Sequence, residues 1–281
     1  MRQCPLTDPA KPTQSEVGAP SPDYRNAHIG EGEDYHRKFF KHIYRAIIWE
    51  IEQRILLDLL GRFLPIPANA RLLDFACGTG RVLALLETRV GTATGIDVSS
   101  SMLAVARDEL SRSRLVCADI THTAELDSER FDIITAFRFF PNAEPELREA
   151  AMSKLSQLLT PDGVLIFNNH LRCDSLRHRL RRLLFALHIK RNRRDLHCMS
   201  DREAEALAER HGLALVARYC FGVLPILKER RPLMPAWLIR AIERRAISID
   251  SRTSAGGHAI YVLRRVGTIA QGMDSPACSS N

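Results

Sequence analysis

The segment Leu72-Leu73-Asp74-Phe75-Ala76-Cys77-Gly78-Thr79-Gly80-Arg81 decides the fold of this 281-residue chain. Apolar residues lead into an acid, a turn with two glycines follows, and residues 81–86 take up helical spacing. This order predicts a buried strand, a tight loop and the start of a helix. Because glycine lacks a Cβ atom, a ligand can lie close to the loop backbone. The segment therefore predicts a small-molecule site at the end of a strand.

Two kinds of cofactor, a dinucleotide and a nucleoside-based methyl donor, bind to glycine loops of this type. A dinucleotide loop needs glycine at its third position, where this chain has Leu83, a side chain too large for the close packing that glycine permits. The segment instead resembles the first motif of the class I S-adenosylmethionine (SAM)-dependent methyltransferases, an acid followed by Gly-x-Gly-x-Gly. Asp74, Gly78 and Gly80 match that motif, and Ala76 stands where its first glycine usually lies. The resemblance implies SAM as the cofactor, and Ala76 suggests a slightly tighter pocket.

Two further acids end strand-like runs. Asp97 closes the second run, and its carboxylate can accept hydrogen bonds from both ribose hydroxyls of an adenosine. Asp119 closes the third run, and the resemblance implies that it meets the adenine amino group. Residues 99–101 are serines that predict a helix start, and the resemblance implies that Met102 packs on the adenine. Altogether it implies cofactor contacts from Asp74, Ala76, Cys77, Gly78, Gly80, Asp97, Val98, Met102, Asp119, Ile120 and Phe137.

The later runs complete a sheet. Runs at 131–137 and 158–167 look like the family's fourth and fifth strands, and runs at 213–219 and 259–263 predict a sixth and a seventh. Strands that alternate with helices favour parallel pairing through right-handed crossovers. We expect an α/β fold, a Rossmann-like, doubly wound, mostly parallel sheet of seven strands with helices on both faces. The three acids then fall at the carboxyl ends of strands, where such sheets bind ligands.

The chain before this core shows a long helical pattern. Residues 34–64 predict two helices or one bent helix, ended by Pro65 and Pro67. The resemblance places such N-terminal helices over the cofactor pocket as a lid, where Tyr35 or Tyr44 either reaches the cofactor or simply packs. The expected organisation is a disordered segment at 1–28, a methyltransferase domain at 29–267 (core 70–170, basic helical insertion 171–199, insertion 223–257) and a flexible tail at 268–281.

Composition and cysteine usage narrow the class of protein. Hydrophobic residues make up 45% of the chain, as in ordinary globular proteins. No run of eighteen apolar residues occurs, so we expect neither a membrane-spanning helix nor a secretory signal. The seven cysteines are odd in number and form no Cys-x-x-Cys pair. We therefore expect no metal, no disulfide framework and a reducing cytoplasm as the compartment.

The positive charge is concentrated in one segment. The chain carries a formal net charge of +7, and residues 172–194 hold nine Lys or Arg against one acid, Asp174. Leucines recur there at helical spacing, which predicts a helix with a cationic outer face. Three interpretations stay open: a solvated face, contact with an anionic acceptor or a membrane surface, and nucleic acid. Nucleic acid is disfavoured, because no appended RNA-binding domain is visible and the fourth strand lacks the Asn/Asp-Pro-Pro-Tyr/Phe motif of enzymes that methylate base amines.

The expected chemistry is methyl transfer. Displacement at a sulfonium methyl needs alignment, and it needs a base only when the acceptor must lose a proton. His170, after the fifth strand, is the candidate base because a neutral imidazole can take a hydroxyl proton; a structural role is the alternative. We expect transfer from SAM, at oxygen, to a small-molecule or lipid-linked acceptor, in the cytoplasm or at the membrane periphery. The alternatives are an RNA- or protein-directed methyltransferase, a catalytically silent SAM-fold protein and an NAD-dependent oxidoreductase.

Overall fold

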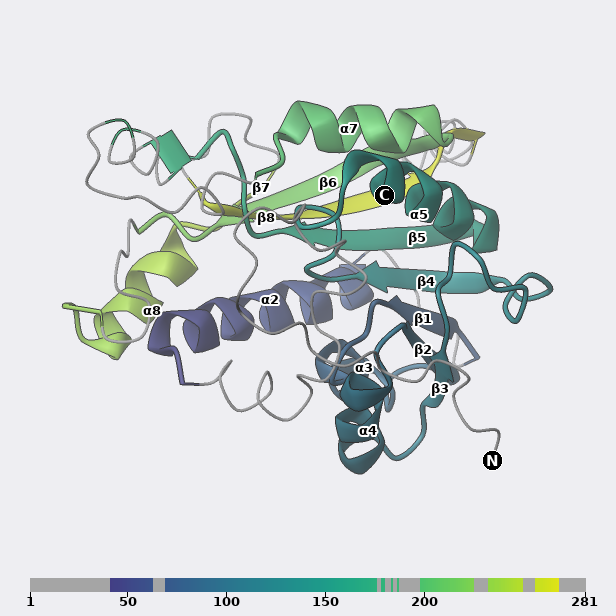
Figure 1. Ribbon diagram of the computed structural model, residues 1–281. Coiled ribbons are helices and arrows are strands. Elements are labelled where there is room, and N and C mark those ends of the chain that lie inside the picture. The colour runs from purple at the N-terminus through teal and green to yellow at the C-terminus, as the bar shows by residue number, and fades with distance from the viewer. Residues whose placement is uncertain are drawn as a thin grey trace, which may run out of the picture.

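The computed structural model describes residues 41–62, 69–175, 178–179, 183, 186, 198–224, 232–249 and 256–267. Its strands are β1 (Arg71–Phe75), β2 (Thr92–Asp97), β3 (Arg114–Cys117), β4 (Phe131–Ala136), β5 (Leu159–Asn169), β6 (Leu213–Phe221), β7 (Ser248–Ile249) and β8 (His258–Arg265). They form one sheet in the order β3-β2-β1-β4-β5-β8-β6-β7 (Figure 1). The expected α/β, Rossmann-like sheet is confirmed.

The first five strands run parallel to one another, and β1 lies between β2 and β4. At the end of β1, Asp74 is in register with Gly95 of β2 on one side and with Thr135 of β4 on the other. The chain runs outward from β1 through β2 to β3 and then returns to β4 across β1. Such a reversal opens a crevice at the carboxyl ends of the two central strands, and doubly wound sheets bind ligands there.

The other half of the sheet is antiparallel. The predicted sixth and seventh strands appear as β6 and β8, and β8 lies between β5 and β6. The sheet has eight strands instead of the seven expected, because Ser248 and Ile249 add the short β7 beside Cys220 and Tyr219 of β6. A strand of two residues is too short for an alternating hydrophobic pattern, so sequence periodicity cannot reveal it.

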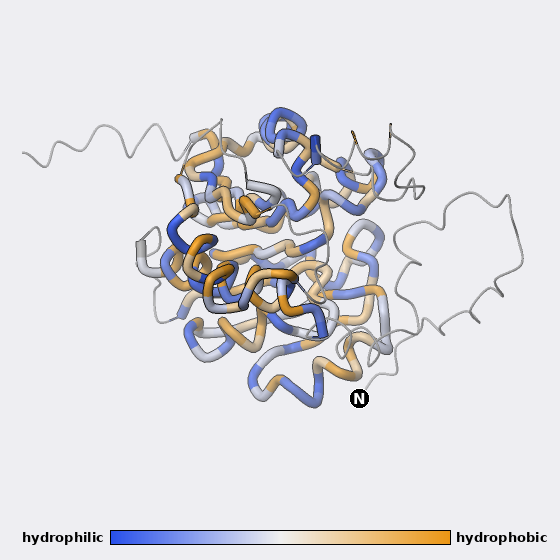
Figure 2. The backbone as a smooth tube through the Cα atoms, turned by 90° about the vertical axis from the view of Figure 1, so that its left-hand side faces the viewer, coloured by the Kyte–Doolittle hydropathy of each residue, from blue (hydrophilic) through white to orange (hydrophobic). Residues whose placement is uncertain are grey.

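Helices cover both faces of the sheet, as expected. They are α2 (Ile43–Arg62), α3 (Arg81–Leu86), α4 (Ser100–Glu109), α5 (Pro145–Leu158), α7 (Asp201–Arg210) and α8 (Ala236–Arg245). Helices α5 and α7 lie on one face, and α2, α3 and α8 lie on the other (Figure 1). Each face has its own apolar core, one around Phe167 and Leu155 and the other around Ile133 and Ile55. In Figure 2 the hydrophobic stretches run mainly through the middle of the molecule and the hydrophilic ones mainly along its outside.

Helix α2 carries most of the predicted N-terminal pattern, and residues 34–40 of that pattern, with Tyr35, lie outside the described residues. The helix is continuous over its twenty residues and buries Ile47, Ile51 and Ile55. The hydroxyl of Tyr44 donates a hydrogen bond of 3.0 Å to Oε1 of Glu243 in α8. That contact supports the packing role for Tyr44 and joins the two helices.

Several expectations fall outside the described residues. These are the disordered segment 1–28, the tail 268–281 and most of the basic segment 172–194. Among the described helices, none combines the length and the apolar character that crossing a membrane requires.

The expectation about cysteines was wrong in one respect. Cys173 and Cys198 form a disulfide, with their Cα atoms 5.3 Å apart. The two residues are 25 positions apart in the chain, and they meet because the end of β5 and the start of α7 lie together. Cysteine spacing alone does not report that proximity.

Candidate cofactor and active site

The loop between β1 and α3 has the backbone shape that its glycines suggested. Gly78 and Gly80 have φ angles of 53° and 76°, in the left-handed region that glycine adopts without strain. A Cβ atom on Gly80 would come within 2.8 Å of Leu110, so packing against the end of α4 requires glycine there. A Cβ atom on Gly78 would meet nothing within 4 Å. Gly78 therefore borders open space, as a loop that receives a ligand should.

Ala76 stands in the same loop with a φ angle of 54°. An alanine in this region is strained by about 1–2 kcal/mol, because its Cβ crowds the following carbonyl oxygen. This conformation explains why the family motif usually has glycine at the matching position. Such strain is often retained at ligand sites.

Asp74 lies one residue before the end of β1 and is buried. Its Oδ1 accepts a hydrogen bond of 2.7 Å from the hydroxyl of Thr135 at the end of β4. Its Oδ2 is buried and has no hydrogen-bond partner in the described part of the chain. Burial raises the pKa of Asp74 to about 7, the nearby charge of Asp97 adds to this rise, and Thr135 and Arg81 oppose it. The site thus holds an acid that would be stabilised by a cationic ligand group.

Thr79, in the glycine loop, carries a second unsatisfied group. Its hydroxyl is buried and also lacks a hydrogen-bond partner within the described ranges. Buried polar groups are nearly always hydrogen-bonded, and an exception calls for a physical explanation such as an absent ligand. Together with the open space at Gly78, these two atoms fit a ligand that brings a cation and further polar groups to the loop.

Asp97, at the end of β2, organises the loop from the other side. Its Oδ2 accepts from the Gly78 amide at 2.8 Å, and its Oδ1 accepts from the Ser99 amide at 2.9 Å. The Ser99 hydroxyl in turn accepts from the amide of Met102, which caps the start of α4. Each carboxylate oxygen can accept more than one hydrogen bond, so these contacts leave capacity for a ligand hydroxyl. The structure therefore brings Asp97, the glycine loop and Met102 together.

Asp119 follows β3 and bonds to its own loop. Its Oδ1 accepts from the amide and hydroxyl of Thr121, at 2.8 and 2.6 Å, and its Oδ2 lies 3.1 Å from Nδ1 of His122. Ile120 is buried beside it, whereas Val98 and Phe137 are half-buried at the ends of their strands. Burial raises the pKa of the Cys77 thiol well above its ordinary value, so Cys77 acts as a small apolar residue of the loop.

His170 lies directly after β5 and is half-buried. The two residues before it are fully buried and hold neighbouring segments in place. The Asn168 side chain accepts from the Arg138 amide at 2.5 Å and donates to Oε1 of Glu52 at 2.8 Å. Arg138 has a φ angle of 62°, so the end of β4 is strained like the end of β1. The catalytic role of His170 stays a prediction.

Sequence reasoning missed the residues that connect distant elements. Glu52 reaches Asn168 across 116 residues, and the guanidinium of Arg81 lies 5.3 Å from the centre of the Trp49 ring. Both contacts attach α2 to the strand ends and the glycine loop. No local pattern identifies such partners. The signal that could have been used for Thr135 is its position at the end of the fourth strand, opposite Asp74.

Residues 73–167 match the family model of a methyltransferase domain, and this segment contains the glycine loop, Asp97 and Asp119. This match assigns residues 73–167 to the methyltransferase-domain family, and the fold and the loop geometry agree with a class I SAM-dependent methyltransferase. Solved structures agree at the level of fold. Magnesium protoporphyrin IX methyltransferase from Synechocystis PCC 6803, with bound SAH, has a TM-score of 0.58 at 13% identity, over 86% of this chain and 97% of that one.

Curated relatives match over about half of the chain. Trans-aconitate 2-methyltransferase of Variovorax paradoxus is 34% identical over 134 residues, 46% of this chain and 49% of the relative. The dTDP-3-amino-3,6-dideoxy-alpha-D-glucopyranose N,N-dimethyltransferase of Streptomyces fradiae is 32% identical over 146 residues, 51% of this chain and 50% of the relative. The chain spans about half the length of these curated relatives.

Proposed function

We propose that this protein binds SAM and transfers its methyl group to an oxygen atom of a small-molecule acceptor. One observation carries the proposal. Within the matched segment, the buried Oδ2 of Asp74 and the hydroxyl of Thr79 lack partners beside the open space at Gly78. An ammonium group near Asp74 would neutralise the carboxylate, and the methionine part of SAM carries such a group. When bound, SAM supplies a methyl group that its sulfonium already activates.

The chain's own residues would divide the cofactor between them. Asp74 would hold the ammonium group, Gly78 would let the cofactor approach the backbone, and Asp97 would accept the ribose hydroxyls. Asp119 would face the adenine amino group. The adenine would lie among Val98, Met102, Ile120 and Phe137, and Ala76, Cys77 and Gly80 would shape the loop around the cofactor. These roles follow from the resemblance together with the positions described above.

The acceptor side would be formed by the chain between β5 and β6 and between β6 and β8. The relatives' names refer to trans-aconitate and to an amino sugar nucleotide, both small molecules, which supports a small-molecule acceptor. Oxygen as the methylated atom rests on His170, whose imidazole would take the hydroxyl proton. A lipid-linked acceptor, contact of residues 172–194 with a membrane periphery and a cytoplasmic location stay predictions.

Turnover with labelled cofactor tests this function. The protein is incubated with SAM labelled in its methyl group and, separately, polycarboxylic acids, sugar nucleotides and vesicles of anionic lipid. We expect labelled product from a small acid or sugar nucleotide. Label recovered only in RNA or protein would favour the alternative substrates, and binding of SAM without any transfer would favour a silent SAM-fold protein.

His170→Ala tests the base on the identified acceptor. The variant should bind SAM with wild-type affinity, whereas turnover should fall by roughly 10²–10⁴, the usual contribution of a general base. His211→Ala is the matched control, because His211 pairs with Glu149 at 2.8 Å on the outer helices. Unchanged turnover in His170→Ala would assign His170 a structural role.

A further inference from the structure

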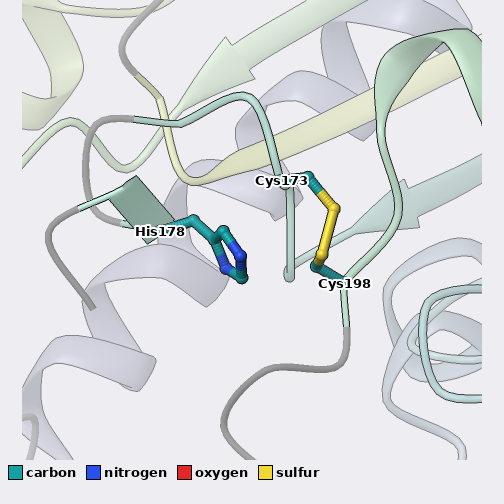
Figure 3. Close-up of side chains that lie close together, drawn as sticks. All are labelled: Cys173, His178 and Cys198. Carbon is teal, nitrogen blue, oxygen red and sulfur yellow. A yellow bond between two sulfur atoms is a disulfide. The ribbon is translucent and has the colours of Figure 1, made fainter. Parts of the chain in front are cut away.

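Two cysteines and one histidine form a cluster shortly after β5, the strand that precedes the candidate base. Cys173 follows β5, Cys198 precedes α7, and His178 lies between them in the chain (Figure 3). The sulfur atoms of the cysteines and a ring nitrogen of His178 all lie within 4.8 Å of one another. His178 is buried, and both cysteines are half-buried. The proposed methyltransferase chemistry uses none of the three.

The backbone holds the two cysteines together independently of their disulfide. The Met199 amide donates to the Leu171 carbonyl at 2.9 Å, and the Cys173 amide donates to the Met199 carbonyl at 3.2 Å. This short parallel bridge joins Arg172 and Met199, the chain neighbours of the two cysteines. The thiols should therefore stay adjacent when the disulfide is reduced.

A buried ion pair fixes the same junction. The Arg172 guanidinium donates two hydrogen bonds to the Asp201 carboxylate, at 2.7 and 2.5 Å, and the Tyr261 hydroxyl donates a third at 2.7 Å. Burial works against ionisation of Asp201, yet these hydrogen bonds and the charges of Arg172 and Arg218 hold its pKa below the ordinary value. Bidentate pairs of this kind fix geometry as well as charge. The ion pair thus holds Arg172, which precedes Cys173, against Asp201, which follows Cys198.

A local turn sets the position of His178. Its amide donates to the Ser175 hydroxyl at 3.1 Å, and that hydroxyl donates to the Arg172 carbonyl at 2.8 Å. The imidazole therefore belongs to the same locked junction as the cysteines. Figure 3 shows it beside the disulfide.

We propose that Cys173, Cys198 and His178 form a zinc site when the disulfide is reduced. Two thiolates and one imidazole are a characteristic Zn²⁺ ligand set, with bonds of about 2.3 Å to sulfur and about 2.0 Å to nitrogen. Tetrahedral ligands at those bond lengths lie roughly 3.5–3.8 Å apart, which the observed spacing allows with a small movement of the sulfurs. The two thiolates balance the charge of the ion, and water takes the fourth position.

The disulfide and the proposed zinc-bound form exclude each other, because zinc needs both cysteines as thiolates. Reduction of the disulfide takes two electrons from an added phosphine, which becomes its oxide with an oxygen from water, and two protons from the same water, and yields two thiols. Zinc then displaces the two thiol protons with no change of oxidation state. In either state the cluster joins the two ends of the segment 174–197, and Cys173 lies three residues after the candidate base His170. Sequence spacing had argued against a metal, because the ligands form no Cys-x-x-Cys pair.

Zinc titration of the full chain tests the proposal. Protein reduced with a phosphine and freed of reductant is titrated with Zn²⁺ against a chromophoric chelator, and oxidised protein is titrated in parallel. We expect reduced protein to bind one zinc ion at this site and oxidised protein to lack it. His178→Ala should weaken binding at least tenfold. His211→Ala, which removes an imidazole that pairs with Glu149 on the outer helices, should bind like the wild type.

Two results would overturn the proposal. One is reduced wild type that binds no zinc, or no more than the double variant Cys173→Ser/Cys198→Ser. The other is a disulfide that resists reduction in the folded protein, which would make the pair a permanent crosslink. Because the comparison of oxidised with reduced wild type needs no substitution, it decides the matter even if the double variant fails to fold. SAM affinity is measured separately, so the proposed function and the zinc site fail or stand independently.

Discussion

Asp74 is a buried acid of the candidate site, and its pKa is raised in the folded protein. Its ordinary pKa of 3.8 applies to the unfolded chain, and burial raises the value to about 7 in the folded protein. Between these pH values the folded state binds one proton more than the unfolded state does. The free energy of unfolding therefore falls as the pH rises from about 4 to 7, and the loss is complete above pH 7.

Asp74→Asn should remove this pH dependence, because asparagine keeps an oxygen for Thr135 and does not ionise. Relative to the wild type, the variant should gain about 2–3 kcal/mol of unfolding free energy between pH 5 and pH 8. Urea unfolding of both proteins at the two pH values measures the difference, and groups common to both cancel. A constant difference between the two proteins would show that Asp74 titrates at its ordinary pKa.

Ala76 offers a test of strain in the same loop. Ala76→Gly relieves the left-handed backbone, and the gain exceeds the added entropy of glycine in the unfolded chain, so the variant should be more stable by roughly 1 kcal/mol. The control is Ala124→Gly, an exposed loop position without a positive φ angle, which should lose about 0.5–1 kcal/mol. Both effects are read from urea midpoints. Equal losses in the two variants would contradict the strain at Ala76.

At the scale of elements, α2 and α8 are joined by two contacts of different strength. Glu243 is fully buried and accepts hydrogen bonds from the Tyr44 hydroxyl and from the amides of Val223 and Leu224, at 3.0, 2.9 and 2.9 Å. Glu50 accepts two hydrogen bonds of 2.8 Å from Arg240, but that pair is partly exposed. Burial should decide which contact stabilises the protein more.

Glu243→Ala should therefore destabilise the protein by about 2–4 kcal/mol, since it leaves buried donors without acceptors. Glu50→Ala, on the same helix pair, should cost at most about 1 kcal/mol. Thermal unfolding of the two variants beside the wild type measures both. If the two variants lose similar stability, the buried network does not anchor α8.

The elements themselves were largely predictable, because their signals are local. The acids at 74, 97 and 119 fall at or just after strand ends, as expected, and the serine cap before Met102 begins α4. A strand of two residues such as β7 has no local signal. Contacts such as Glu52 with Asn168 depend on the folding of segments that are far apart in the chain.

At the scale of the molecule, the sequence pointed to the cofactor half and left the acceptor half open. The glycine loop can be recognised from the sequence because the residues that define it are consecutive. The junction of Arg172, Cys173, Cys198 and Asp201 does not, because it is assembled from the end of β5 and the start of α7. The expected absence of a disulfide was wrong for the same reason. Cys173 and Cys198 form a disulfide because the fold brings them together, and their spacing in the sequence does not indicate this.

The central claim is that the loop at Gly78 receives SAM, and two glycines provide the test. Gly78 and Gly212 both have positive φ angles, and a Cβ atom at either would meet nothing within 4 Å. Gly212 follows α7, away from the cofactor crevice. Valine at either position adds comparable backbone strain, about 1–2 kcal/mol, but only at residue 78 would it enter the space proposed for the cofactor.

We would therefore titrate the wild type, Gly78→Val and Gly212→Val calorimetrically with SAM, and the wild type also with NAD. The account predicts one SAM per wild-type chain, wild-type affinity in Gly212→Val, at least a hundredfold loss in Gly78→Val and no binding of NAD. Equal SAM affinity in the two valine variants, or binding of NAD in place of SAM, would contradict it.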